Sequence, residues 1–179
     1  EWASQTVPSE PAQEFYCGTS DVFAGRSSTL KNNLGKINDS SIDSSLLTAT
    51  VDEIGENSYA HNLCNWPDIS GIFFAYDLNK RVIVLADRGR GILETLKIVR
   101  PKLQSHKEAL EVAFTQVISG RPGENRGRGL KSVKFNVLTS NVKLTFRTGD
   151  AELDLKKGDQ KLNITECETF HGCFASLKF

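Results

Sequence analysis

Methionine is absent from this chain, and cysteine and proline are scarce, with four and five residues respectively. The cysteines form no C-x-x-C pair, so the sequence predicts neither a zinc site nor a disulfide framework. No apolar stretch approaches the roughly 18 residues that span a bilayer, and the first residues lack the pattern of a signal peptide. These absences argue against a membrane or disulfide-rich protein. We therefore expect a cytoplasmic globular protein.

Domain organisation is predicted from length and from the composition of the first residues. The start at Glu1 and the lack of methionine are what we expect either of a piece of a longer chain or of a trimmed one. Residues 1–13 carry Pro8, Pro11 and small polar residues without periodicity, which predicts a flexible tail. Residues 14–179 have the length of one domain with a sizeable core.

Charge is unevenly distributed, although the formal net charge is zero. Residues 88–134 hold eleven Lys or Arg against four Glu, an excess of +7. Such a segment is either a solvated basic face or a surface that attracts phosphates. Because the charges alternate with glycines rather than with stacking aromatic residues, we favour a nucleoside triphosphate over a nucleic acid as the ligand.

Hydrophobic periodicity predicts an α+β fold with one long helix over residues 44–65. Further helices are expected over 28–37, within 92–118 and over 130–138, and strands over 71–77, 81–86, 142–146, 151–155, 162–167 and 172–179. This order predicts a two-layer α/β sandwich, in which a mixed and mostly antiparallel sheet carries helices on one face.

The most informative motif, D-R-G-R-G at residues 87–91, directly follows the apolar run 82–86. It places the carboxylate of Asp87 at the end of a strand, where it can accept a hydrogen bond from an adenine amino group. Gly89 and Gly91 allow a sharp turn and a close approach of the backbone to a ligand.

Two further motifs flank this one in the sequence. Glu53, Asn57 and His61 recur at a spacing of four and share one face of the predicted helix. Downstream, Gly127 and Gly129 precede a new helix, whose first backbone N–H groups can bind phosphate.

In this order the three motifs resemble the N-box and the two glycine boxes of the GHKL ATPase superfamily, which includes the ATPase component of gyrase and the histidine kinases. The resemblance spans about residues 45–179 and implies a Bergerat-type ATP-binding fold with ATP and Mg²⁺ as ligands. It implies a catalytic role for Glu53, which polarises water in hydrolysing members, and a Mg²⁺ ligand in Asn57.

The remaining roles also follow from the resemblance. Asp87 would read adenine, Gly89 and Gly91 would form the turn beside it, and His61 would contact phosphate. Gly127 and Gly129 would present N–H groups to the phosphates, while Arg126, Arg128 and Lys131 would add positive charge. The stretch 92–125 corresponds to the lid over bound ATP. One departure concerns Cys173, which stands where the superfamily often has a threonine under the adenine.

Three functions are compatible with this pattern. A stand-alone domain that phosphorylates a protein partner would resemble the anti-sigma-factor kinases within the histidine-kinase branch. A slow ATPase would resemble the gyrase branch, whose catalytic lysine from a following domain is missing here. A non-catalytic nucleotide sensor would switch a protein partner by lid closure. A homodimer is compatible with each, and we favour phosphotransfer or weak hydrolysis because both Glu53 and Asn57 are present.

Overall fold

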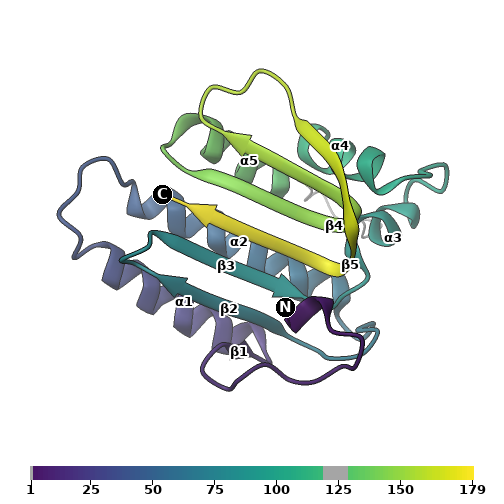
Figure 1. The fold of residues 1–179 in the computed structure, drawn as a ribbon, viewed down its shortest axis with the longest axis horizontal. Helices are drawn as coiled ribbons and strands as arrows, with labels where there is room; N and C mark the ends of the chain where they lie inside the picture. Colours follow the sequence, from purple (N-terminus) through teal and green to yellow (C-terminus); the bar gives the residue numbers. More distant parts are fainter. Residues whose placement is uncertain (1, 119–128) are drawn as a thin grey trace.

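The computed structural model describes residues 2–118 and 129–179, which form two layers (Figure 1). One layer is a five-stranded sheet in the order β1-β2-β3-β5-β4, and every pairing in it is antiparallel. The α-helices of the described residues cover one face of this sheet. The strands are β1 (Tyr16–Cys17), β2 (Ile72–Asp77), β3 (Val82–Asp87), β4 (Lys143–Lys156) and β5 (Asn163–Lys178). The predicted two-layer α/β sandwich is confirmed, but its sheet is antiparallel throughout rather than mixed.

Helix α2 (Ser44–Asn62) is the central helix of the layer and lies between α1 and α5. It begins where the Asp43 side chain accepts a hydrogen bond from the backbone N–H of Leu46. Its buried stripe includes Leu47, Val51 and Ile54, as the predicted periodicity required. The opposite neighbour, α5 (Gly129–Thr139), brings Gly129 beside it.

Helix α1 (Ser20–Leu34) begins eight residues before the predicted 28–37 segment. Thr19 caps it by accepting a hydrogen bond from the N–H of Val22. Phe23, Leu30 and Leu34 are buried along one face, so the apolar stripe already starts in the first turn. The prediction was wrong here because it began at the polar centre of the helix and overlooked this cap.

Strands β4 and β5 each contain two of the predicted strands. β4 turns back at Gly149, whose φ is +57°, so its two halves lie side by side (Figure 1). Across this bend, Thr145 donates a 2.6 Å hydrogen bond to Asp154, and Arg147 forms an ion pair with Glu152. The sequence predicted an interruption within each of these two strands. The structure has a bend there instead, and the register of the β4–β5 pairing shifts at the same point.

The predicted helical stretch 92–118 contains two separate helices, α3 (Gly91–Lys97) and α4 (His106–Thr115). A segment containing Pro101 separates them, and Ser105 caps α4 by accepting from the N–H of Glu108. Both helices contribute buried residues to the core. The glycine-rich part of the predicted lid, residues 119–125, lies outside the described residues.

Residues 2–5, in the segment predicted as a flexible tail, lie against the sheet face away from the helices (Figure 1). Trp2 and Ala3 belong to a short 3-10 helix, η1 (Trp2–Ser4), and Ala3 is 3% exposed. The Trp2 ring stacks on Phe73 of β2 at a centroid distance of 6.5 Å. These contacts give the segment a defined position.

Candidate functional site

Asp87, the last residue of β3, is the centre of a hydrogen-bonded turn. Its carboxylate is buried, and Oδ1 accepts from the N–H groups of Gly89 and Cys173 at 2.8 and 3.2 Å. Oδ2 accepts from the hydroxyl of Ser58 at 2.7 Å. Burial raises the pKa of Asp87, while these three hydrogen bonds act in the opposite direction. A carboxylate has about four lone-pair sites, so the three donors leave about one of them unfilled in a side chain that is 2% exposed.

Gly91 and Gly172 give the turn its close packing. Gly91 has a φ of +73°, and a Cβ there would lie 2.8 Å from Oγ1 of Thr148. Gly172 has a φ of +77°, and a Cβ there would overlap the backbone carbonyl of Asp87. Both positions favour glycine because the left-handed region and the short approach each disfavour a side chain.

Asn62, at the end of α2, fixes the same turn to the helix. Its Nδ2 donates to the carbonyl of Ser58 at 2.8 Å, and its Oδ1 accepts from the N–H of Arg90 at 2.9 Å. Gly89 packs directly on the Asn62 amide, where no Cβ would fit. Asn62 was not predicted from the sequence, although it lies just one residue beyond the spaced polar triplet.

Glu53 and Asn57 meet the beginning of α5. A Cβ built on Gly129 would lie 2.7 Å from Oε1 of Glu53 and 2.9 Å from Nδ2 of Asn57. Glu53 is half-buried, and this burial, followed by the negative charge of Glu56, raises its pKa. The structure therefore brings these two predicted residues together with a glycine that lies more than 70 positions away in the sequence.

Of the other predicted site residues, the structure describes His61 and Lys131. His61 lies half-buried in the last turn of α2, and its backbone carbonyl accepts from the guanidinium of Arg90. Lys131 is half-buried in the first turn of α5. Gly127, Arg126 and Arg128 lie outside the described residues.

A threonine does occur behind the turn, but it comes from the neighbouring strand. Thr148 of β4 is fully buried opposite Cys173, and its Oγ1 donates to the carbonyl of Gly172 at 3.0 Å and accepts from the N–H of Ile92 at 3.1 Å. Burial, followed by the charge of Asp87, raises the pKa of the Cys173 thiol well above its ordinary value. The alternation of inward-facing residues in β4 leads to Thr148, so this signal was present in the sequence.

Metal ligands are sparse around these motifs. No group of three His, Cys, Asp or Glu residues in the described ranges is arranged to hold a metal ion. Mg²⁺ commonly retains waters and takes substrate phosphates as ligands, so it needs few protein ligands.

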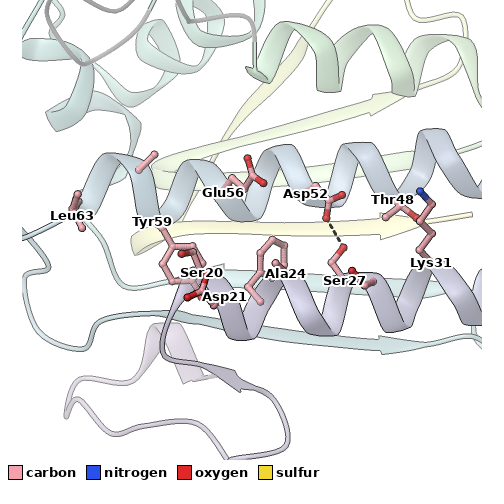
Figure 2. A pocket seen from close by; sticks show the side chains of 13 residues that line it. Ser20, Asp21, Ala24, Ser27, Lys31, Thr48, Asp52, Glu56, Tyr59 and Leu63 are labelled. Carbon is pink, nitrogen blue, oxygen red and sulfur yellow. Dashed lines mark hydrogen bonds between the residues drawn. The ribbon is translucent and has the colours of Figure 1, made fainter.

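A groove lies between α1 and α2 (Figure 2). This groove has a volume of about 590 Å³ and is lined in part by Ser27, Asp52 and Tyr59. The hydroxyl of Ser27 donates to the carboxylate of Asp52 across it. None of the predicted site residues lines the groove, so it is separate from the turn around Asp87.

Comparison with known proteins provides no assignment: no family model matches this chain, and no curated protein matches its sequence. Within residues 2–118 and 129–179, no helix has the length and apolar character needed to cross a membrane. Function is therefore inferred from the chemistry of the residues around Asp87 and Gly129.

Proposed function

We propose that this chain binds ATP with Mg²⁺ and uses it for phosphotransfer to a protein partner or for slow hydrolysis, as a GHKL-type ATP-binding domain. The observation that carries the proposal is the position of α2 between the turn after Asp87 and Gly129. Ser58 on this helix donates to Asp87, and the preceding residue, Asn57, lies beside Gly129. One rigid helix thus links a base-reading carboxylate to a phosphate-binding helix terminus.

Recognition of adenine is assigned to Asp87. Its carboxylate is held by three donors and has one lone-pair site left for the exocyclic amino group of the base. A guanine would present a carbonyl oxygen at the corresponding position, and two acceptors would then face each other. The buried carboxylate therefore favours adenine over guanine.

Phosphate binding is assigned to the beginning of α5. The first N–H groups of an α-helix lack partners within the helix and carry a partial positive charge. Gly129 allows a close approach there because it has no side chain. Lys131 in the same turn adds a positive charge that favours a triphosphate.

Glu53 and Asn57 supply the chemistry at the phosphate end. Magnesium bound with ATP neutralises charge on the phosphates, and the amide oxygen of Asn57 is suited to ligate it. Glu53 is the candidate base for water or for an acceptor hydroxyl, because its raised pKa makes it a better proton acceptor than an ordinary glutamate. The position of this carboxylate beside Gly129 favours catalysis over a purely nucleotide-sensing role.

Calorimetric titration of the purified chain with ATP, with and without Mg²⁺, tests the proposal. We expect magnesium-dependent binding of ATP, with GTP as the matched control binding more weakly. Phosphate release measured on the same sample then separates hydrolysis from binding without turnover. Absence of ATP binding in both conditions would contradict the proposed function.

A further inference from the structure

Arg88 is a buried cation inside the turn that carries Asp87. Its side chain is 3% exposed and forms an ion pair with Asp68, in which Nε and Nη2 donate to the carboxylate at 2.8–3.1 Å. This pairing lowers the pKa of Asp68. A buried guanidinium needs acceptors for all its N–H groups, and the carboxylate serves only one side of the planar group.

Residues 2–5 provide the acceptors for Nη1 of this guanidinium. Nη1 of Arg88 donates to the backbone carbonyls of Trp2, Ala3 and Gln5 at 3.3, 3.2 and 2.8 Å. Ala3 is buried, and the Trp2 ring packs on Phe73. The segment is therefore bound through its backbone by one arginine and through its side chains by the sheet.

The backbone of Arg88 is part of the turn that forms the proposed adenine site. It follows Asp87 and precedes Gly89, whose N–H donates to the Asp87 carboxylate. Phe73 pairs in register with Ala86, the residue before Asp87. A movement of residues 2–5 would therefore reach this turn by two routes. One is the guanidinium of Arg88, and the other is strand β2, where Trp2 packs on Phe73.

We propose that Arg88 is a positioning residue which couples the docking of residues 2–5 to nucleotide binding at Asp87. When the segment is docked, the guanidinium is satisfied and the turn is held in the form that binds the base. When the segment leaves, Arg88 loses three acceptors, and its side chain must turn toward water or other groups. This inference rests on the proposed function.

Coupling between two binding events is reciprocal. If docking of residues 2–5 strengthens ATP binding by some factor, then ATP must strengthen docking by the same factor. An arginine with a purely structural role would stabilise the fold, but it would not make the segment respond to nucleotide. The response of the segment to ATP is therefore the deciding measurement.

Two variants release the segment in different ways. Ala3→Arg places a second, bulky cation at a buried position beside Arg88, and Trp2→Ala removes the stacking on Phe73. The matched control is Arg26→Ala, because Arg26 also donates to two backbone carbonyls near the start of the chain, those of Gln13 and Glu14. Its contacts do not involve Asp87 or the turn that follows it.

Trp2 is also a natural reporter. The only other tryptophan is Trp66, which packs on Tyr59, so Trp66→Phe leaves Trp2 as the single tryptophan fluorophore. In this background we expect ATP to change the Trp2 emission, with a half-saturation equal to the calorimetric Kd. Ala3→Arg should shift the emission to the red without nucleotide, as expected for a ring released to water.

The expected result is a loss of ATP affinity of about fivefold or more in Ala3→Arg, the lower range of known couplings. Trp2→Ala should lose affinity in the same direction, and Arg26→Ala should retain the parent affinity. Unchanged ATP affinity in an Ala3→Arg chain that shows the red shift would overturn the coupling, and so would a Trp2 emission that is indifferent to saturating ATP. If Ala3→Arg fails to fold by circular dichroism, Trp2→Ala and the Trp2 emission decide the question. Failure of the parent chain itself to bind ATP would refute the proposed function, and the coupling with it.

Discussion

The hydroxyl of Ser58 donates a 2.7 Å hydrogen bond to Oδ2 of Asp87, across 29 positions of sequence. This bond joins helix α2 to the end of strand β3 and helps to keep a buried carboxylate in place. Since α2 also carries Glu53 and Asn57, the bond fixes the distance between the proposed adenine and phosphate ends of the site. Ser58 thus holds Asp87 in a fixed position relative to Glu53 and Asn57.

Replacement of Asp87 by asparagine tests recognition of the base. Asp87→Asn keeps the shape of the side chain but substitutes an amide for the buried carboxylate, so we expect ATP binding to weaken by roughly 1–3 kcal/mol, the scale of a hydrogen bond to a charged group. Calorimetry measures this change. Asp77→Asn, at the end of the adjacent strand β2, is the matched control and should bind like the parent. Equal affinity of Asp87→Asn and the parent would remove the central claim.

The same carboxylate predicts a pH dependence of stability in the chain without nucleotide. Burial raises the pKa of Asp87 above its ordinary value of 3.8. The folded chain therefore binds the carboxyl proton of Asp87 more tightly than the unfolded chain does. The stabilising contribution is complete below 3.8 and is lost as the pH rises through the raised value. Urea denaturation of the parent and of Asp87→Asn should therefore show the parent losing stability relative to the variant with increasing pH. A difference that stays constant with pH would contradict this reasoning.

The proposed base predicts a separation of turnover from binding. Glu53→Ala should abolish phosphate release or phosphotransfer, while Mg-ATP binding persists, because the carboxylate acts on the nucleophile rather than on the nucleotide. Phosphate release and calorimetry on one preparation measure both. An equal loss of binding would instead indicate a structural carboxylate.

Glu56→Gln is the companion variant, because Glu56 is an exposed neighbour whose charge raises the pKa of Glu53. Removing this charge should lower the pKa of Glu53, although burial still keeps it raised. The acid limb of the pH profile of turnover should then move to lower pH, with little change at the plateau. A shift in the opposite direction would exclude Glu53 as the titrating base.

A larger residue at position 129 tests the proposed phosphate site by a steric effect. An alanine there would bring its Cβ to 2.7 Å from Oε1 of Glu53, so Gly129→Ala must displace the helix start or the two α2 side chains. We expect weaker Mg-ATP binding by calorimetry. Gly25→Ala in α1 is the control, since no atom lies within 4 Å of the position that its Cβ would take, and it should raise stability by about 0.5–1 kcal/mol. Normal nucleotide affinity in Gly129→Ala would separate this glycine from the site.

Local sequence signals determined much of the fold. The long helix was predictable because its apolar residues recur with helical period. Its cap was not predicted, since Asp39 and Ser40 were the expected caps and the structure has Asp43 there. The paired strands β2 and β3 were predictable because two apolar runs flank a short polar turn. The positions of Asp87, Gly91 and Gly129 were predictable for the same reason, since they lie at the ends of such elements. Their role in a nucleotide site stays a prediction.

Other features were decided by tertiary structure alone. Arg88 binds the carbonyl of Gln5 across 83 positions, and Cys173 donates to Asp87 across 86. No local pattern specifies such partners, because the residues meet only after the sheet has formed and the chain has closed on itself. Thr148 behind the turn and the docked residues 2–5 belong to the same class. The sequence by itself determined which groups lie at the ends of the strands and helices. Packing of the two layers decided which of these groups meet, because hydrogen bonds and close contacts depend on distance in space.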